Sequence, residues 1–302
     1  MAVVVMFPGQ GVQSPAMGAP WRETAGWQLV EEAAERLDEP VTDCLLGDAP
    51  ERTADAQLAV FLTSLLAWQA AKDDVGPVLT YAGHSLGQLT ALVAAGALSF
   101  AEGVHLVARR GQLTQAVADR VGGRMAVLLG AAPEQAQAAC QAAPGECWVA
   151  NDNAPGQIVV AGTDEGVTRA GEAALAAGAR KIMPLRVGGA FHTPLMAPAA
   201  DAFAEQLAVT EFTRPTAPVV SNADARAYMD SGPWGSRLAS HLVRPVLWRQ
   251  SLHTMVELGA TRLVEVGPGG VLAGLAKRTV PDVPVQSVSA PEDVGRLEGA
   301  AA

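Results

Sequence analysis

Short runs of β-branched and apolar residues alternate along this chain with longer runs in which apolar residues recur every three or four positions. The clearest short runs are Val3–Phe7, Val78–Ala82, Pro218–Ser221 and Arg262–Val266. Between the first two, five apolar residues have the spacing of one helix face: Leu58, Phe61, Leu62, Leu65 and Leu66. The alternation predicts an α/β protein with a largely parallel sheet, on which this helix packs by its apolar face.

The middle of the chain has a different order of elements. The pattern there predicts strands at Met125–Leu129, Cys147–Ala150, Gln157–Ala161 and Lys181–Val187, with one helix beginning at Pro133 and a second over Asp164–Ala177. The order βαββαβ is typical of a ferredoxin-like unit. We therefore expect an α/β core formed by residues 1–123 and 188–302, interrupted by a small ferredoxin-like subdomain over residues 124–187.

Composition narrows the class of protein. Of the 302 residues, 49% are hydrophobic, which is enough for a large core, but the apolar runs are shorter than the roughly 18–20 residues that cross a bilayer. The net charge of −10 disfavours nucleic acid and anionic membranes as partners. The first seven residues resemble a strand rather than a signal peptide. Three cysteines without CxxC spacing fit a cytoplasmic protein better than a disulfide scaffold or a zinc site.

One five-residue motif indicates nucleophilic chemistry. Residues 83–87 read Gly-His-Ser-Leu-Gly and lie between the predicted strand Val78–Ala82 and an apolar helical run from Leu86. Glycines are needed in such a turn because the backbone bends too tightly for Cβ atoms, and the turn presents the serine hydroxyl at the edge of the sheet. The positive end of the following helix favours an oxyanion there. Ser85 is therefore a candidate nucleophile, and the alternative is an ordinary glycine-rich turn.

A serine nucleophile needs a base to accept its proton. His192 follows the predicted strand Lys181–Val187, in a loop that can reach the carboxyl edge of the sheet. The chain has four other histidines, His84, His105, His241 and His253. Of these, only His241 stays an alternative base, because the others adjoin the serine or lie in helical patterns. We predict His192 as the base, and a purely structural role for it is the second alternative.

Arg110 lies on an apolar helix face. Its neighbours three and four positions away are Leu106, Val107 and Leu113. A cation in such surroundings requires an anion, because leaving one member of a buried charge pair without its partner costs roughly 3–5 kcal/mol. The anion could be an internal Asp or Glu. The alternative is a carboxylate that arrives with the substrate, which a guanidinium binds through two parallel hydrogen bonds.

Other patterns suggest no metal or nucleotide chemistry. Two glycine-rich turns, at residues 8–13 and 267–270, lack the complete spacing of a dinucleotide loop or a P-loop. No His, Cys or carboxylate cluster has metal-ligand spacing. The sequence therefore predicts neither a metal site nor nucleotide hydrolysis.

Six motifs occur in one order along the chain. They are Phe-Pro-Gly-Gln-Gly-x-Gln at residues 7–13, Gly-His-Ser-Leu-Gly at 83–87, Arg-Arg-Gly at 109–111, Asn-x-Asn-x-Pro-Gly-Gln at 151–157, Gly-Ala-Phe-His at 189–192 and Glu-Val-Gly-Pro-Gly at 265–269. In this order the chain resembles malonyl-CoA:acyl-carrier-protein transacylases, from the first strand to about residue 280. The resemblance implies a hydrolase-like α/β core that carries the small subdomain, with the active site in the cleft between the two.

The resemblance also implies a role for each matching residue. Ser85 would be the acylated nucleophile, His192 its base, and Arg110 the clamp for a malonyl carboxylate. The backbone N–H groups of Gln10 and Leu86 would form the oxyanion hole. The implied reaction is a ping-pong transfer: Ser85 takes the malonyl group from malonyl-CoA, and the phosphopantetheine thiol of an acyl carrier protein then receives it, in fatty acid or polyketide synthesis.

Further residues follow from the same comparison. A backbone carbonyl would orient the base at His241, where the family usually has Gln or Asn, and Gln88 stands where Glu usually follows the serine turn. Asn153, Gln157 and Phe191 would line the pocket, and Phe191 would favour malonyl over methylmalonyl groups. No bound cofactor is implied beyond the coenzyme A thioester substrate, and the family resemblance suggests a monomer.

An acidic carrier and the phosphates of coenzyme A require local positive charge on an enzyme of net charge −10. The candidates are Arg109, Arg180, Lys181, Arg186, Arg244, Lys277 and Arg278, and the alternative is that they are dispersed surface residues. Three other functions stay open from the sequence: a hydrolase of acyl thioesters that uses the same residues, an acyltransferase for a different acyl group, and a non-catalytic module that binds a carrier protein.

Overall fold

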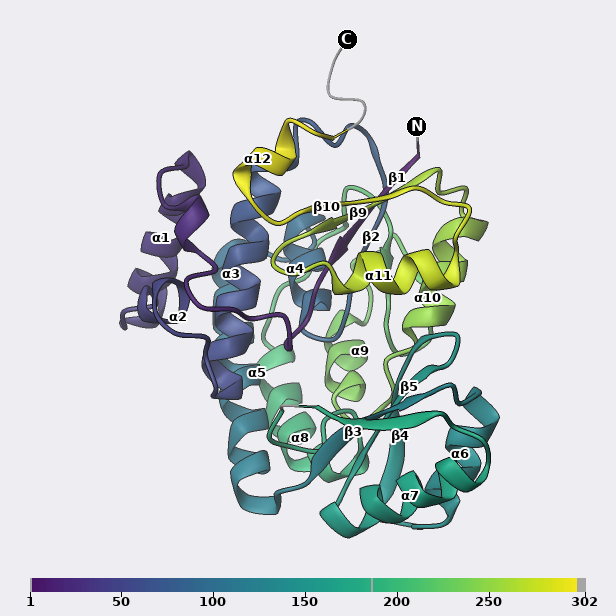
Figure 1. Ribbon diagram of the computed structural model, residues 1–302. Coiled ribbons are helices and arrows are strands. Elements are labelled where there is room, and N and C mark those ends of the chain that lie inside the picture. The colour runs from purple at the N-terminus through teal and green to yellow at the C-terminus, as the bar shows by residue number, and fades with distance from the viewer. Residues whose placement is uncertain (1, 186, 298–302) are drawn as a thin grey trace.

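The computed structural model describes residues 2–185 and 187–297, and two separate sheets organise the chain (Figure 1). The larger, sheet A, has the strand order β10-β9-β1-β2-β7-β8. Its strands are β1 (Val3–Phe7), β2 (Val78–Gly83), β7 (Val219–Val220), β8 (Ala227–Tyr228), β9 (Arg262–Val266) and β10 (Val285–Val288). All neighbours in sheet A are parallel except β7 and β8. The predicted α/β class with a largely parallel sheet is confirmed.

Alternate residues of β1 point to opposite faces of sheet A, and each face has its own core. Val3, Val5 and Phe7 pack toward α3, α4 and α5, whereas Val4 and Met6 pack toward α10 and α11 (Figure 1). The α-helices around sheet A are α1 (Gln28–Leu37), α2 (Asp43–Leu46), α3 (Thr53–Ala71), α4 (Gly87–Ala94), α5 (Phe100–Val121), α8 (Ala197–Leu207), α9 (Trp234–His241), α10 (Trp248–Glu257), α11 (Val271–Thr279) and α12 (Pro291–Val294). Short 3-10 turns lie at Ala19–Trp21, Ala25–Trp27 and Pro194–Met196. Among the described residues, no helix combines the length and the apolar character that crossing a membrane requires.

Two details of sheet A differ from the sequence-based prediction. The strand predicted at Pro218–Ser221 contains only Val219 and Val220, because the N–H of Ser221 already bonds to Arg226 in the turn that leads to β8. The helix expected to pack on the sheet by one apolar face is α3, and its burial extends beyond the five residues of that face. Residues 56–67 are buried on every side of this helix, since α3 lies between sheet A and helices α1 and α5.

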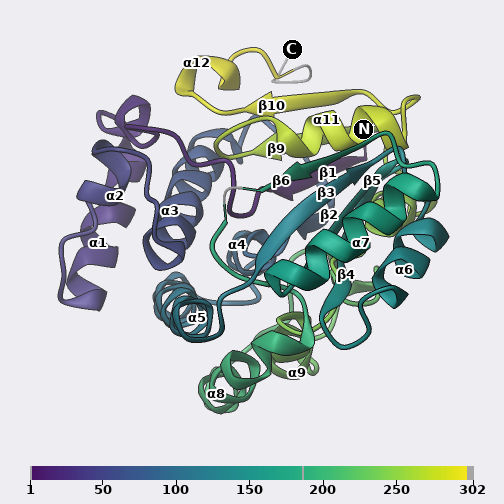
Figure 2. The ribbon, with the colours of Figure 1, turned by 60° about the horizontal axis from the view of Figure 1, so that its bottom comes forward.

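Sheet B is small and antiparallel, with the strand order β4-β5-β3-β6. Its elements are β3 (Arg124–Leu129), α6 (Pro133–Gln141), β4 (Cys147–Ala154), β5 (Gln157–Gly162), α7 (Asp164–Ala176) and β6 (Lys181–Pro184). Helices α6 and α7 cover one face (Figure 2), and the other face packs against Ala190 and Phe191. This is the ferredoxin-like arrangement expected from the sequence. The exact division at residues 124–187 stays a prediction.

Two strands of sheet B differ in length from the prediction. Strand β6 ends at Pro184, and not at Val187. Its last residue pair with β3 is Pro184 with Ala126, and the N–H of Leu185 still donates to the carbonyl oxygen of Met125 at 3.0 Å. Strand β4 continues four residues beyond the predicted end at Ala150, to Ala154. Two irregularities in its pairing with β5 let this extension reach the core, where Val246 exchanges backbone hydrogen bonds with Ala150 and Asp152, both of 2.9 Å. The end of β4 is thereby fixed beside the carboxyl edge of sheet A.

Candidate active site

Ser85 lies at the tip of a sharp turn between β2 and α4. A Cβ atom on Gly83 would lie 1.8 Å from the carbonyl oxygen of Gly87, and one on Gly87 would lie 2.2 Å from the carbonyl oxygen of Phe7. Only glycine fits at either position. Ser85 itself has a φ of 53°, in the left-handed region that is unfavourable for residues with a side chain. The hydroxyl therefore stands clear of the sheet edge.

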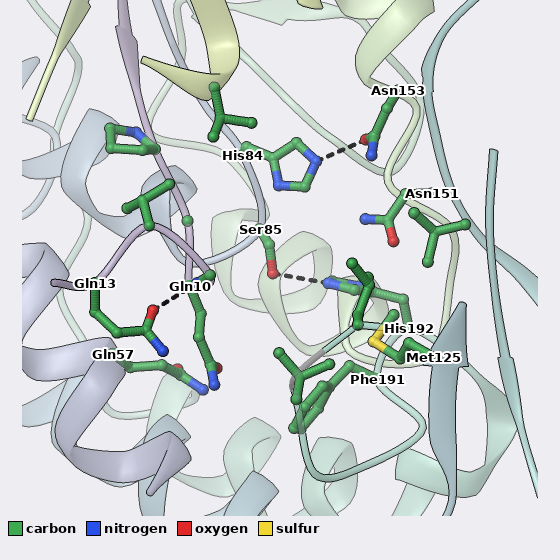
Figure 3. A pocket seen from close by; sticks show the side chains of 18 of the residues that line it. Gln10, Gln13, Gln57, His84, Ser85, Met125, Asn151, Asn153, Phe191 and His192 are labelled. Atoms are coloured by element: carbon green, nitrogen blue, oxygen red, sulfur yellow. Dashed lines mark hydrogen bonds between the residues drawn. The ribbon is translucent and has the colours of Figure 1, made fainter. Parts of the chain in front are cut away.

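Ser85 is hydrogen-bonded to His192, as Figure 3 shows, and His192 is in turn hydrogen-bonded to the backbone of His241. Ser85 Oγ lies 2.7 Å from His192 Nε2, and His192 Nδ1 lies 2.9 Å from the carbonyl oxygen of His241. A carbonyl oxygen can only accept, so Nδ1 carries the proton and Nε2 presents its lone pair to the serine hydroxyl. His192 also has a left-handed φ, of 61°. The tautomer is thus the one that a general base requires.

The surroundings keep His192 neutral. Burial lowers the pKa of His192 to about 3, with the Arg110 cation acting in the same direction and the His241 carbonyl opposing it. Burial likewise lowers the pKa of His84 and, with His192 and Arg110, that of His241. The site therefore holds three uncharged imidazoles around one guanidinium at neutral pH.

Arg110 reaches the nucleophile from α5. Its Nη1 donates to Gln57 Oε1 at 2.5 Å and its Nη2 donates to Ser85 Oγ at 3.1 Å. Among the described residues no carboxylate lies within ion-pair distance of this buried guanidinium. Burial lowers the pKa of Arg110 to about 10, so the group stays charged at neutral pH. The sequence left two possible anions for Arg110, an internal Asp or Glu and a substrate carboxylate. The internal partner is excluded among the described residues.

Two backbone N–H groups, of Gln10 and Leu86, belong to the turns that meet at Ser85. The turn after β1 comes so close to the serine turn that a Cβ on Gly9 would lie 2.5 Å from the carbonyl oxygen of His84. In the part of the chain that the structure describes, the N–H groups of Gln10 and Leu86 donate to no protein acceptor. Both N–H groups are therefore free to donate, and the oxyanion hole that the resemblance implied for them stays a prediction.

These groups open onto a cleft of about 740 Å³ between the two sheets. Phe191, Gln157 and Asn153, the three predicted pocket residues, all line it. Asn153 Oδ1 accepts a hydrogen bond of 2.9 Å from His84 Nε2 (Figure 3). Sheet A thus contributes the nucleophile, and β4 and β5 of sheet B contribute polar groups on the opposite wall.

Sequence reasoning did not identify several residues of the site. Gln57 is a buried amide on the largely apolar helix α3, and Asn222 follows strand β7 and accepts the Ser85 N–H at 2.7 Å. A polar residue within an apolar helix, or directly after a strand at the carboxyl edge, is the signal that could have found them. His84 was rejected as a base, and it bonds instead to Asn153 in the cleft wall.

The basic residues proposed for the rim are on the surface. Arg109, Arg180, Lys181, Arg244, Lys277 and Arg278 are exposed, and none of them forms an ion pair within the described residues. Arg186 lies outside the described residues. Among those residues there is also no gathering of three or more His, Cys, Asp or Glu side chains that could hold a metal ion.

A strand-turn-helix serine, a neutral histidine and two free backbone N–H groups define an α/β enzyme of the serine-nucleophile class, suited to acyl transfer or acyl hydrolysis. Comparison with known proteins is more specific. Residues 4–298 match the acyl transferase domain family, and the chain belongs to that family.

Individual relatives match along nearly the whole chain. The malonyl CoA-acyl carrier protein transacylase of Bacillus subtilis (strain 168) is 36% identical over 301 residues, covering 97% of this chain and 95% of the relative. An acyl carrier protein S-malonyltransferase from Vibrio cholerae has a TM-score of 0.93 at 35% identity, over 99% of this chain and all of that one. A malonyl-transacylase solved with a type II polyketide synthase acyl-carrier protein also has a TM-score of 0.93, at 34% identity, over 98% of this chain and 99% of that one.

Proposed function

We propose that this protein transfers a malonyl group from malonyl-CoA to the phosphopantetheine thiol of an acyl carrier protein through a malonyl ester of Ser85. The observation that carries the proposal is Arg110. Its guanidinium is buried, charged and without a carboxylate partner in the described chain, and it touches the nucleophilic oxygen at 3.1 Å. A carboxylate that completes this charge pair would hold the rest of an acyl group beside Ser85. The names of the relatives support malonyl as that group and an acyl carrier protein as the acceptor.

The first half-reaction acylates the serine. Ser85 Oγ attacks the thioester carbon while its proton passes to His192 Nε2, and the carbonyl oxygen becomes an oxyanion that the N–H groups of Gln10 and Leu86 stabilise. The tetrahedral intermediate then breaks its C–S bond. His192 returns the proton to the departing sulfur, which leaves as the thiol of coenzyme A. The imidazolium exists only between these two proton transfers, and the carbonyl of His241 stabilises it through Nδ1.

The second half-reaction repeats these steps with the carrier as nucleophile. His192 takes the proton of the phosphopantetheine thiol, the sulfur attacks the Ser85 ester, and the same two N–H groups hold the oxyanion. The C–O bond then breaks and the proton returns to Ser85 Oγ. One thioester is exchanged for another, so the reaction is balanced without an oxidant, a reductant or a metal ion. We therefore propose that the enzyme uses no cofactor beyond its two substrates. We also propose a cytoplasmic location, which fits three cysteines that form no disulfide.

A two-stage mass measurement tests the proposal. The purified protein is mixed with malonyl-CoA and its intact mass is recorded, and a phosphopantetheinylated acyl carrier protein is then added. We expect one malonyl group on the protein in the first stage and its appearance on the carrier in the second. An adduct that is lost only to water would make the protein a thioester hydrolase. No adduct at all would contradict the proposed chemistry.

A further inference from the structure

Asn222 uses every one of its polar groups next to the nucleophile. It follows β7 and is 1% exposed. Its side-chain Oδ1 accepts from the N–H of Ser85 at 2.7 Å, and its Nδ2 donates to the carbonyl oxygen of Gly83 at 2.6 Å. Its own N–H donates to Gln88 Oε1 at 2.9 Å, and its carbonyl accepts from the N–H of Leu247 at 2.9 Å. One amide therefore ties both sides of the serine turn to a neighbouring strand and to the chain segment before α10.

These contacts act on the strained part of the turn. The left-handed conformation of Ser85 costs on the order of 1–3 kcal/mol and persists only where the surroundings enforce it. The two side-chain hydrogen bonds of Asn222, at the carbonyl of Gly83 and at the N–H of Ser85, lie on either side of His84 and hold the peptide that leads into the strained residue. If the amide is removed, both groups become unpaired in a buried place, and the turn can relieve its strain by rotating the serine.

The same contact separates the roles of two adjacent N–H groups. The N–H of Ser85 is occupied by Asn222, whereas the N–H of Leu86 has no protein acceptor in the described chain. The orientation of the peptide before Ser85 is thereby fixed, and the next N–H is left for the oxyanion. Asn222 thus influences the nucleophile and the oxyanion hole together, without touching either reacting atom.

Gln88 completes the arrangement. Its Oε1 accepts from the Asn222 N–H, and its Nε2 donates to the carbonyl oxygen of Val220 at 3.1 Å. Of glutamine and glutamate, only glutamine can accept at one atom and donate at the other at neutral pH, because a carboxylate has no donor. The glutamine found here in place of the expected glutamate therefore matches the two backbone groups that face it.

We propose that Asn222 is a positioning residue for acylation, held by Gln88, and that it keeps Ser85 and the Leu86 N–H in their reactive arrangement. This inference rests on the proposed function, because it concerns the rate at which Ser85 is acylated. Asn222 acts through the serine turn and does not contact the substrate in this proposal.

The test compares Asn222→Ala with wild type by rapid quench and intact mass, with malonyl-CoA as the probe. We expect the maximal rate of malonyl-enzyme formation to fall about 100-fold, since a misplacement of about 1 Å has effects of this size. The malonyl-CoA concentration for half-maximal rate should change less than threefold, because Arg110 is untouched. Ser221→Ala is the matched control: it removes a buried hydroxyl beside Asn222 that makes no hydrogen bond to the turn within the described chain, and it should acylate at the wild-type rate.

Asn222→Asp keeps the test decisive if the alanine variant does not fold. Aspartate retains an oxygen for the Ser85 N–H, but its second oxygen can donate to the Gly83 carbonyl only when it is protonated. The acylation rate of this variant relative to wild type should therefore be highest at about pH 5.5 and fall as the pH rises toward about 8.5. A defect of general packing would not change this ratio in that direction.

The outcomes separate this inference from the proposed function. If wild type forms no malonyl-enzyme, the proposed function fails. If wild type is acylated and Asn222→Ala reaches a maximal rate within threefold of it, only the positioning role is overturned. If the alanine variant does not fold, the test is the acylation rate of Asn222→Asp divided by that of wild type. The positioning role is overturned if this ratio stays level or rises with pH.

Discussion

Arg110 is a cation whose protein contacts, within the described chain, are the uncharged oxygens of Gln57 and Ser85. A buried guanidinium without an anion is unstable unless a ligand completes the pair. A carboxylate on the acyl group would complete the pair, and Arg110 would thereby select that group.

Arg110→Ala should lose malonyl transfer and gain relative activity on a neutral acyl thioester such as acetyl-CoA. Losing one partner of a buried charge pair costs roughly 2–5 kcal/mol, which corresponds to a fall of about 30- to 5,000-fold in kcat/KM for malonyl-CoA. Steady-state transfer rates for both substrates measure the change. Arg109→Ala, at the exposed neighbouring position, should behave as wild type toward malonyl-CoA. Malonyl transfer by Arg110→Ala within a few-fold of wild type would refute the carboxylate clamp.

Three neutral histidines make stability depend on pH. The pKa values of His84, His192 and His241 are lowered in the folded protein, whereas an unfolded histidine takes up a proton below about pH 6.5. The unfolded state therefore binds more protons there, and the free energy of unfolding falls as the pH decreases. Each histidine contributes a slope of about 1.4 kcal/mol per pH unit once it is protonated in the unfolded chain.

His241→Gln removes one of these groups while it keeps the backbone carbonyl that contacts His192. Urea unfolding between about pH 7 and pH 5 should give a slope smaller than that of wild type, by a difference that approaches about 1.4 kcal/mol per pH unit below about pH 6. His105→Gln, on the exposed side of α5, is the control and should keep the wild-type slope. If His241→Gln and wild type lose stability in parallel, the account of His241 as a neutral buried imidazole is wrong.

The residues of the site differ in how far the sequence predicts them. Ser85 and His192 stand out because each lies in a local motif directly after a predicted strand, and chain topology brings the ends of those strands together. Asn222 and Gln57 have a weaker local signal, a single polar residue after a predicted strand or within a largely apolar helix, with no motif around it. Their importance depends on contacts across 137 positions, to Ser85, and across 53 positions, to Arg110, and a single sequence does not contain this pairing.

At the scale of elements, the turn between β2 and α4 depends on the absence of side chains. The space around Gly87 is filled by the carbonyl groups of Phe7 and Pro8, whereas a Cβ on Gly274, within α11, would meet no atom within 4 Å. The same substitution is therefore expected to have opposite effects at the two glycines.

Gly87→Ala should lower the free energy of unfolding by more than about 2 kcal/mol, because its methyl group overlaps backbone atoms that cannot move independently. Gly274→Ala should raise it by about 0.5–1 kcal/mol, since alanine restricts the unfolded chain and favours the helix. Chemical unfolding of both variants measures the difference. Equal effects at the two positions would contradict the close packing described for the serine turn.

The elements themselves were predicted well where the local pattern decides them. The strands Val3–Phe7 and Arg262–Val266 match the prediction, because a run of buried residues and its flanking turns define them. The prediction was incomplete where tertiary contacts determine the structure. Residues 56–67 of helix α3 are buried on all sides by neighbours that the periodicity of the helix does not reveal, and β4 extends to Ala154 because Val246 pairs with it.

At the scale of the whole molecule, the two sheets must keep a fixed separation for the cleft to work. Asp152, near the end of β4, accepts from Arg249 Nη2 at 2.7 Å and from Arg249 Nε at 2.9 Å, and it also accepts from Gln250 at 2.8 Å. Its side chain is 6% exposed. The residues on either side of it, Asn151 and Asn153, line the cleft. This ion pair therefore holds one wall of the site against the core.

Asp152→Ala should lower the free energy of unfolding by about 3 kcal/mol, because it leaves a partly buried guanidinium without its partner. It should also lower kcat/KM, since Asn153 loses its support. Glu32→Ala removes an exposed pair with Arg36 and should cost no more than about 0.5 kcal/mol. Urea unfolding and transfer assays on both variants make the comparison. A loss for Asp152→Ala no larger than that for Glu32→Ala would show that the contact does not join the sheets.

The central claim is that Ser85 carries the malonyl group between the two thiols. The most direct measurement is peptide mapping of protein quenched in acid after a brief exposure to malonyl-CoA. The account predicts close to one malonyl group per chain, located on the peptide that contains Ser85, absent from Ser85→Ala, and removed by a phosphopantetheinylated carrier protein. A malonyl group on any other residue, or equal labelling of Ser85→Ala, would contradict the account.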